Sequence, residues 1–352
     1  MRIFSFTLLF LFSLPVLSQI GGRSVYSFLD LNSSARVASV GGYNVSLNAN
    51  DPSLIYFNPA LLNDSLDNHL AINYTDYYAG INYGYVSYSR HIEKYGDFAA
   101  GLHYINYGKF IRADETGVEN GTFNASEYAF NLSYSKPLNT YFRAGVNIKP
   151  VFSFFDSWSS YGMVSDLGLN YTSANRLLSS GLVIHNLGLQ FKSYTGEYTE
   201  PVKPEIIAGV SWKLKHAPFR FSLTARHLEK WDLTYDKPIN NEEWANVFDT
   251  VPAKTKKIEE FGDKALRHLV IGTELIIFRN FYVSFGYNYQ RRQELKIETR
   301  PAMVGFSWGF GLRVSKFMIS FSRATYHLAG GTNHFSVTTN LNQFMRKQQI
   351  SE

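Results

Sequence analysis

The chain contains one short motif with the spacing of a catalytic nucleophile. Residues 305–309 read Gly-Phe-Ser-Trp-Gly and match the G-x-S-x-G pattern, in which a sharp strand-to-helix turn exposes a reactive serine. Here the motif falls within a segment where Phe306 and Trp308 alternate with glycine and serine, which is the period of an extended strand. Small residues facing inward leave room inside a barrel. We therefore do not expect Ser307 to be catalytic, or the chain to be an enzyme.

Metal and cofactor chemistry has no matching pattern either. The chain has no cysteine, which excludes disulfides, thiolate metal sites, cysteine nucleophiles and lipid attachment to an N-terminal cysteine. No phosphate-binding glycine motif is present. The nine histidines are dispersed, without H-x-H or H-x-x-x-H spacing, at positions 69, 91, 103, 185, 216, 227, 268, 327 and 334. We expect no metal and no cofactor.

The composition is aromatic and polar at once. Of the 352 residues, 16% are aromatic and only 18% are charged, against roughly 25% charged residues in an ordinary globular protein. The mean hydropathy of −0.17 argues against a bundle of membrane helices, which needs several apolar runs of about 20 residues. The net charge of +5 is spread thinly, so we expect no nucleic-acid partner.

Strict alternation of apolar and polar residues dominates from about Leu70 to Leu341. For example, Tyr128, Phe130 and Leu132 are separated by smaller or polar residues, and this period of two is the signature of a strand. Fourteen candidate strands follow: 69–77, 80–90, 96–107, 125–135, 141–154, 160–172, 178–187, 203–213, 218–229, 266–277, 281–291, 301–313, 316–326 and 332–341.

The pattern favours a transmembrane antiparallel β-barrel of about 14 strands over a soluble sandwich. The strands are about 10 residues long, as a tilted crossing of the bilayer requires, and aromatic residues gather near their ends. The long connections 108–124, 188–202, 230–265 and 292–300 all follow odd-numbered strands, whereas connections after even-numbered strands are tight. Long outer loops with short periplasmic turns are the rule for outer-membrane barrels.

The N-terminal part of the chain does not follow the strand pattern. Residues 1–18 have one positive charge, an apolar stretch and small residues before Gln19, and therefore predict a secretory signal peptide; an N-terminal helix of the folded domain is the alternative. Residues 19–68 are too apolar for a solvated tail, so we expect a hatch or plug in the lumen. The barrel is expected over 69–341, followed by a periplasmic tail, 342–352.

Three charged residues predict an interior ladder. If the hairpins close symmetrically about their turns, Lys149 faces Glu127 on one side and Asp166 on the other. Opposite charges on neighbouring strands stabilise a sheet. We expect this row to stabilise the barrel or to dock the plug, without a catalytic role.

The loop 230–265 is unusually aromatic for a solvated connection. It carries four large aromatic residues among many charges, namely Trp231, Trp244, Phe248 and Phe261. A purely solvated loop does not usually hold so much aromatic area, which favours contact with a protein partner. A loop that packs on itself, or a lid, is the alternative.

Two segments near the N-terminus carry a family resemblance. SARVASVGG (34–42) and DPSLIYFNPALL (51–62) resemble the N-terminal signature of the FadL-like outer-membrane barrels, which have fourteen strands and an N-terminal hatch. Within that superfamily the chain is most similar to the PorV/PorQ family of the type IX secretion system, PorQ-like members in particular. The residues that carry this likeness are 20–42, 95–110 and 216–236.

The resemblance implies a non-enzymatic component of protein secretion in the outer membrane of Bacteroidota. Such members act with PorU, PorV and PorZ in a cell-surface attachment complex, which joins secreted cargo to lipopolysaccharide. The hatch positions carried over are Arg36, Gly41, Gly42, Asn58 and Pro59. The competing interpretation is a FadL-type transporter of hydrophobic small molecules, which should have an apolar pocket between the plug and the lumen wall.

Overall fold

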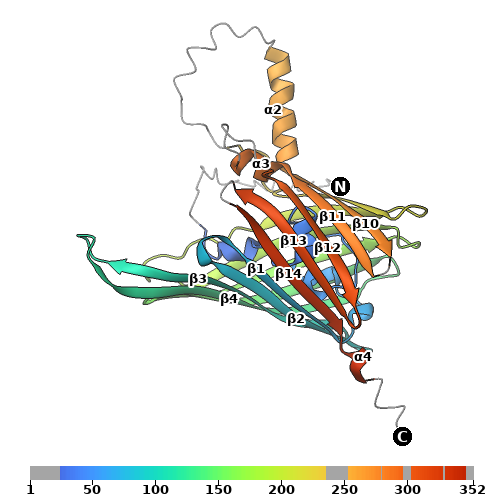
Figure 1. Ribbon diagram of the computed structural model, residues 1–352, viewed down its shortest axis with the longest axis horizontal. Helices are drawn as coiled ribbons and strands as arrows, with labels where there is room; N and C mark the ends of the chain where they lie inside the picture. Colours follow the sequence, from blue (N-terminus) through green and yellow to red (C-terminus); the bar gives the residue numbers. More distant parts are fainter. Residues whose placement is uncertain (1–23, 235–252, 279, 296–302, 328–329, 346–352) are drawn as a thin grey trace, which may run out of the picture.

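The structure is a computed structural model that describes residues 24–234, 253–278, 280–295, 303–327 and 330–345. Within these residues, fourteen antiparallel strands form a closed barrel in which each strand pairs with its sequence neighbours and β1 pairs with β14 (Figure 1). The strands are β1 (His69–Asp76), β2 (Asn82–Ile92), β3 (Gly96–Ala113), β4 (Glu119–Pro137), β5 (Phe142–Phe155), β6 (Trp158–Thr172), β7 (Leu178–Lys192), β8 (Glu205–Lys213), β9 (Phe219–Ala225), β10 (Leu269–Phe278), β11 (Phe281–Asn288), β12 (Phe306–Val314), β13 (Phe317–His327) and β14 (Gly330–Asn340).

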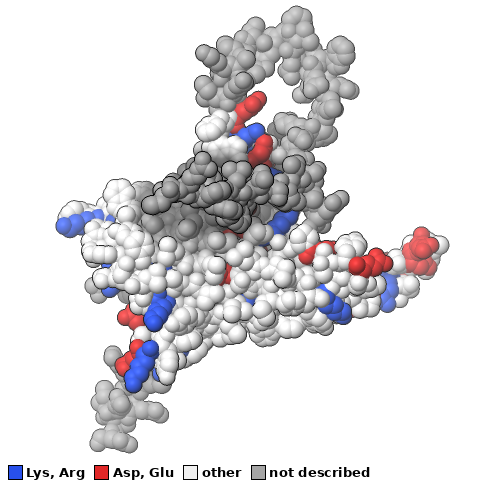
Figure 2. Space-filling view, turned by 180° about the vertical axis from the view of Figure 1, so that it is seen from behind, with Lys and Arg blue, Asp and Glu red and all other residues white. Residues whose placement is uncertain are grey.

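Alternation along the strands produces two opposite faces, which confirms the predicted transmembrane barrel. On β4, Phe130 and Leu132 point outward with 47% and 56% of their surface exposed, whereas the intervening Asn131 is fully buried in the lumen. The wall seen in Figure 2 is mostly free of charged side chains, which gather toward its ends. Such an apolar outer face around a polar interior is the arrangement of a barrel in a bilayer. None of the helices in the described segments is both long and apolar enough to cross a membrane.

The two ends of the barrel differ, and we name them by their connections. The long-loop end carries the connections after odd-numbered strands, including α2 (Ala253–Arg267), α3 (Tyr289–Leu295) and η5 (Tyr78–Gly80). The short-turn end carries the tight turns after even-numbered strands and α4 (Asn342–Met345). Figure 1 shows α2 and α3 at one end and α4 at the other.

Several predicted boundaries differ from the structure, among them the end of the seventh strand, at Lys192 instead of 187, and the start of the twelfth, at Phe306 instead of 301. Most of the predicted loop 108–124 is strand, because β3 and β4 continue pairing beyond the wall as a projecting hairpin (Figure 1). Its turn is held by Asp114, whose Oδ1 accepts the backbone N–H of Thr116 and of Val118. The ninth strand ends at Ala225 instead of 229, and the eleventh at Asn288, where α3 begins.

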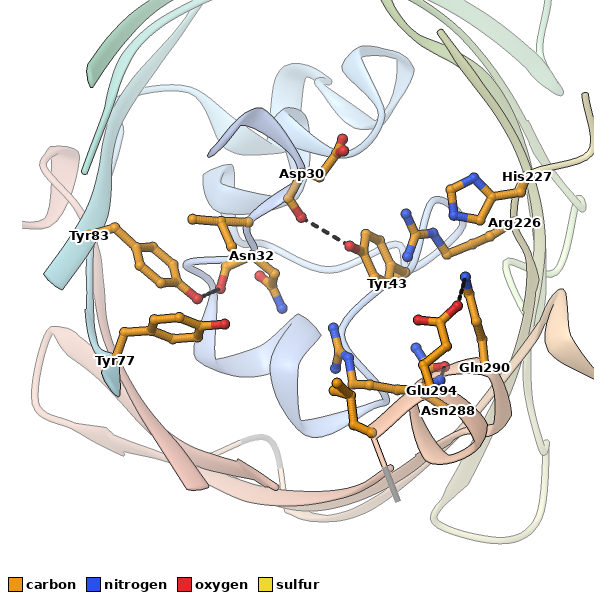
Figure 3. A pocket seen from close by; sticks show the side chains of 13 residues that line it. Asp30, Asn32, Tyr43, Tyr77, Tyr83, Arg226, His227, Asn288, Gln290 and Glu294 are labelled. Carbon is orange, nitrogen blue, oxygen red and sulfur yellow. Dashed lines mark hydrogen bonds between the residues drawn. The ribbon is translucent and has the colours of Figure 1, made fainter. Parts of the chain in front are cut away.

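The N-terminal segment, residues 24–68, lies inside the barrel in short helical turns. They are η1 (Ser27–Asp30), α1 (Ala35–Ser39), η2 (Pro52–Tyr56), η3 (Pro59–Leu61) and η4 (Asp64–Leu66). α1 packs against β11 to β14, η2 against β1 and β2, and η3 against β4 to β6. The segment therefore contacts the wall around most of the lumen, as Figure 3 also shows.

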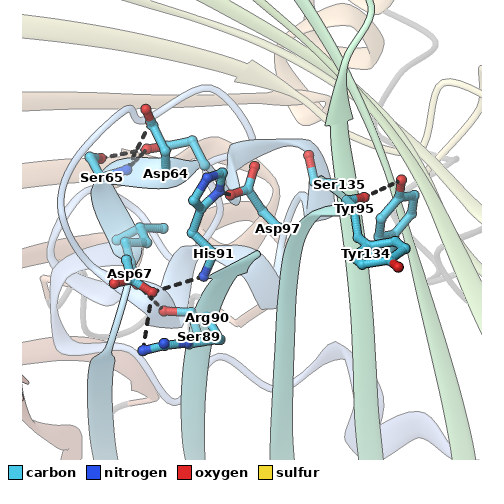
Figure 4. A network of polar contacts seen from close by, with 12 residues as sticks. Asp64, Ser65, Asp67, Ser89, Arg90, His91, Tyr95, Asp97, Tyr134 and Ser135 are labelled. Carbon is cyan, nitrogen blue, oxygen red and sulfur yellow. Dashed lines mark hydrogen bonds and ion pairs between the residues drawn. The ribbon is translucent and has the colours of Figure 1, made fainter. Parts of the chain in front are cut away.

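Polar contacts fasten the segment where it enters β1 at the short-turn end (Figure 4). Asp67 accepts the backbone N–H of His91 at 2.9 Å, and the His91 ring lies 2.7 Å from Asp97. Arg143 of β5 reaches the other oxygen of Asp97 at 2.5 Å. Asn342 of α4 donates to Asp67 at 3.3 Å. The start and the end of the barrel thus meet in one network.

Candidate functional site: the occupied lumen and its mouth

Arg36 joins α1 to the wall through a buried ion pair. Its Nε lies 2.9 Å from Oε1 of Glu274 on β10, and Arg220 of β9 lies 3.0 Å from Oε2 of the same carboxylate. The Arg36 guanidinium also stands over the Tyr282 ring, 4.5 Å from its centroid. Only 2% of the Glu274 side chain is exposed, so separating the segment would leave a carboxylate buried beside one arginine instead of two.

The two glycines after α1 fit where no other residue would. Gly41 and Gly42 have φ of +103° and +94°, which is a conformation that strongly favours glycine. Gly41 also approaches the wall closely, because its N–H donates to the Ser307 hydroxyl at 3.1 Å. Ser307 in turn donates to the Ser39 carbonyl at 3.0 Å. The serine of the G-x-S-x-G motif therefore holds the segment, as a mid-strand hydroxyl can.

Asn58 and Pro59 form a second docking point. The Asn58 side chain caps η3 by accepting the Ala60 N–H at 2.9 Å, and it donates to the Val45 carbonyl at 2.7 Å. A Cβ atom added to Gly145 of β5 would lie 2.4 Å from the Pro59 backbone. Small residues in the wall thus make space for backbone in the lumen.

Wall glycines of this kind form two patches, which sequence reasoning missed. In each, an added Cβ would come within about 3 Å of the N-terminal segment; the first is Gly145, Gly168, Gly181 and Gly209, and the second is Gly272, Gly286 and Gly309. Inward-facing glycines recurring in adjacent strands were the available signal, because glycine weakens a strand unless another backbone approaches closely.

Lys149 and Asp166 form a fully buried ion pair at 2.7 Å. The two are not directly opposite, since Lys149 pairs with Val164, but the diagonal position is within reach of a lysine. Lys149 also donates to Asn186 at 3.0 Å, and Asn186 donates to Asp30 of the N-terminal segment at 2.9 Å. Asn186 thus links the pair to the segment, and Lys149 also stands over the ring of Tyr56 in η2, 5.4 Å from its centroid.

Glu127 does not belong to this row, contrary to the expectation. It stands opposite Ser153 instead of Lys149, and it accepts hydrogen bonds from Tyr107 at 2.5 Å and from Ser153 at 2.8 Å. The register differs because Asn139 holds the hairpin turn, accepting the N–H of residues 141 and 142. The turn is thereby centred farther along the chain than symmetrical closure assumed.

Two of the four loop aromatics pack together. The Trp231 ring lies 5.3 Å from Phe261 of α2 and stacks on His268 at 5.6 Å. Both Trp231 and Phe261 still expose more than half of their surface. Trp244 and Phe248 lie outside the described residues, as do residues 1–18 and most of the tail 342–352. The described part of the loop is thus partly self-packed and partly open.

A pocket of about 300 Å³ opens at the long-loop end, between the N-terminal segment and the wall. On one side Arg226 pairs with Glu205 through two bonds of 2.7 and 2.8 Å and stands 3.1 Å from the centre of the Tyr43 ring. Figure 3 shows Tyr77 and Tyr83 on the opposite side. The lining is mainly polar, and within the described residues no group of three or more acidic or histidine side chains is arranged to hold a metal.

Comparisons with known proteins found similar solved structures at low sequence identity. No family model and no curated protein matches the sequence. The toluene transporter TbuX of Ralstonia pickettii has 10% identity and a TM-score of 0.49 over 89% of this chain and 98% of its own. The P. putida toluene transporter TodX has 12% identity and a TM-score of 0.48, covering 89% and 99%. A Pseudomonas aeruginosa FadL homologue has 13% identity and a TM-score of 0.44, covering 88% and 98%.

Sequence identities this low say nothing about the function of this chain, which has to come from its own residues. Its strands close into a barrel, its outer face is apolar, and its long connections lie at one end. Over its described residues, the protein is a transmembrane β-barrel of fourteen antiparallel strands.

Proposed function

We propose that this barrel is a non-enzymatic scaffold that holds a protein partner at its long-loop end. The observation that carries the proposal is the N-terminal segment, which is docked across the lumen by buried ion pairs and by close contacts with wall glycines. A lumen built around such contacts gives a rigid support. On the resemblance of residues 20–42, 95–110 and 216–236, we place this role in the cell-surface attachment complex of the type IX secretion system. PorZ, PorU and PorV are the expected partners.

The polar lining of the pocket at the long-loop end supports this role over transport of hydrophobic solutes. A transporter needs an apolar pocket between the segment and the wall, because apolar solutes bind by burying apolar surface. The pocket found there is lined by Asp30, Arg226, Arg291 and Glu294, among other polar residues. Placing an apolar solute beside these groups would remove them from water without new hydrogen bonds.

The projecting β3–β4 hairpin offers a surface for a partner. Beyond Asn106, β3 pairs only with β4 among the described strands, and β4 pairs with β5 only from Ala125 onward. Both edges of the ribbon are therefore open to strand addition. Its tip exposes Ile111 and Val118, at 63% and 61%, and such apolar residues on a projecting element are typical of contact surfaces.

Transport of hydrophobic small molecules is the second candidate, and one observation favours it. Val25, Phe28 and Leu29 of the N-terminal segment pack on an apolar part of the wall that includes Ile105 and Val151. If these residues moved aside, they would vacate an apolar space inside the barrel. Uptake of a labelled hydrophobic solute into vesicles containing the purified barrel, above that into empty vesicles, would support this candidate.

The hairpin tip gives a direct test of partner binding. We expect the double variant Ile111→Ser/Val118→Ser to lose its partners when the outer membrane is gently solubilised and the tagged barrel is captured for mass spectrometry. Each substitution removes apolar contact area worth about 1–3 kcal/mol when buried, so recovery should fall at least tenfold.

The matched control lies at the other end of the barrel. Tyr95 and Leu138 expose 67% and 63% of their surface at the short-turn end, and Tyr95→Ser/Leu138→Ser should leave recovery unchanged. Capture of the wild-type barrel alone, together with normal cargo secretion in a deletion strain, would contradict the scaffold role.

A further inference from the structure

The pocket at the mouth contains a buried donor that the protein itself leaves without an acceptor. Asn32 lines the pocket and is 3% exposed. Its Oδ1 accepts the N–H of Ser34 at 2.9 Å, but its Nδ2 has no hydrogen-bond partner among the described residues. Leaving a buried donor unpaired costs about 1–3 kcal/mol. A ligand that brings an acceptor to this nitrogen would remove that cost.

The pocket presents acceptors as well as donors. Glu294 contributes a carboxylate to the lining, and Asp30 lines the pocket as well, with its own carboxylate accepting from Asn186 at 2.9 Å. Glu294 is held in place by Gln290, which donates to it at 2.9 Å, and Figure 3 shows both on the side opposite Tyr77. A ligand that satisfies the Glu294 carboxylate on one side and the Asn32 amide N–H on the other must itself donate and accept. Among uncharged groups, a hydroxyl does both.

The charge of the lining disfavours a simple anion. Arg226 is neutralised by its two bonds to Glu205. The remaining guanidinium, Arg291, shares the pocket with the carboxylates of Asp30 and Glu294. An anion would therefore meet two carboxylates beside one guanidinium, whereas a neutral ligand would meet no net repulsion.

Two aromatic rings complete the surface on which such a ligand would rest. Tyr77 and Tyr83 meet edge to face, with centroids 5.7 Å apart, and the Tyr83 hydroxyl donates to the Asn32 carbonyl at 3.2 Å. Tyrosine combines an apolar ring with a polar tip, which suits a ligand that has C–H faces and hydroxyl edges. The volume of about 300 Å³ is at the lower limit of ligand pockets.

We propose that the mouth pocket binds a neutral, hydroxyl-rich ligand: one or two sugar units of a glycan. Asn32 Nδ2 is the donor to a sugar oxygen, the carboxylate of Glu294 accepts from sugar hydroxyls, and the tyrosine pair supports the ring. The pocket belongs to the long-loop end, since its lining follows β1, β9 and β11. This site is independent of the partner surface on the β3–β4 hairpin.

Binding is tested on the full-length barrel in a detergent without a sugar headgroup, such as lauryldimethylamine oxide. The probes are maltose, cellobiose and lactose, each measured by saturation-transfer NMR and titrated for affinity. We expect transfer to at least one disaccharide. Asn32→Asp keeps the oxygen that accepts from Ser34 and removes the amide donor, and should weaken binding about tenfold or more. Tyr77→Ala, which removes the ring, should weaken binding as well.

Asn175 provides the matched control. It lies in a turn at the short-turn end, where its Oδ1 accepts the N–H of Leu177 at 3.0 Å, so Asn175→Asp makes the same chemical change away from the pocket and should bind as the wild type does. Absence of transfer to all three disaccharides would overturn the proposal, as would wild-type affinity in both Asn32→Asp and Tyr77→Ala. Displacement of the sugar by equimolar phosphate or acetate would show an anion site instead.

Discussion

Replacing Lys149 with methionine is expected to lower the free energy of unfolding by about 3–5 kcal/mol. Lys149 and Asp166 are both fully buried, so the variant would leave the Asp166 carboxylate in the lumen wall without its lysine, beside the His185 ring at 3.3 Å. The loss should appear as a lower midpoint of urea unfolding in lipid vesicles, followed by tryptophan emission. Lys136→Met, at an exposed position near the end of β4, is the control and should change the midpoint little.

A second substitution distinguishes the loss of the ion pair from the loss of the lysine side chain's bulk. Asp166→Asn keeps an oxygen that can accept from the backbone N–H of Asn186, which now donates to Asp166 at 3.0 Å. We expect Lys149→Met/Asp166→Asn to regain most of the lost stability, because no unpaired charge remains. Equal stability of Lys149→Met and the wild type would show that the ion pair contributes nothing.

Replacing Gly286 with valine is expected to displace the N-terminal segment from the lumen. A Cβ at this position would lie 2.1 Å from the Gly41 backbone nitrogen and 2.3 Å from the Val40 carbonyl carbon. Overpacking costs about 1–3 kcal/mol even where neighbours can adjust, and backbone adjusts poorly. The strand itself should tolerate valine, which is a good strand former.

Displacement has two readouts. Trypsin should cleave the variant after Arg36, whose side chain is only 12% exposed in the docked segment, and the barrel should conduct ions in a planar bilayer. Phe285→Val, the neighbouring position on the lipid face where 58% of the side chain is exposed, should do neither. If Gly286→Val remained protected and closed, the glycine patches would have no role in docking.

Much of the barrel could be predicted from the sequence, because each strand has one face in lipid and one in the lumen. This forces the period of two that Phe130, Asn131 and Leu132 illustrate. The number of strands also followed from the alternation. Strand length was harder to predict: the β3–β4 hairpin continues beyond the membrane wall, where no lipid enforces alternation, so its residues were taken for a loop.

Contacts between distant segments were harder to predict from the sequence. The position of Glu127 depended on a turn whose centre is fixed by the Asn139 side chain, and a shift of a few residues changes every pair in a hairpin. The mid-strand position of Ser307 was enough to predict that it is not catalytic. Its hydrogen bond to Gly41 could not be predicted, because the two residues are far apart in the chain. Likewise, Asn32 lies in a stretch without a motif, and only folding shows its unpaired amide.

The scaffold role requires that the N-terminal segment stays docked in the lumen while the long-loop end binds the partner. A disulfide lock tests this requirement most directly. The hydroxyl oxygens of Ser39 on α1 and Ser284 on β11 are 2.6 Å apart, and the chain has no cysteine of its own. In Ser39→Cys/Ser284→Cys, an oxidised pair would therefore tie the segment to the wall without competing thiols. The single variant Ser39→Cys serves as the control.

The decisive measurement is partner recovery and cargo secretion in a deletion strain that expresses the locked barrel. We predict that the oxidised double variant captures the same partners, in the same amounts, as the single variant, and restores secretion equally. Function that is lost in the oxidised form and returns on reduction with dithiothreitol would show that the N-terminal segment must move, and would contradict the scaffold role.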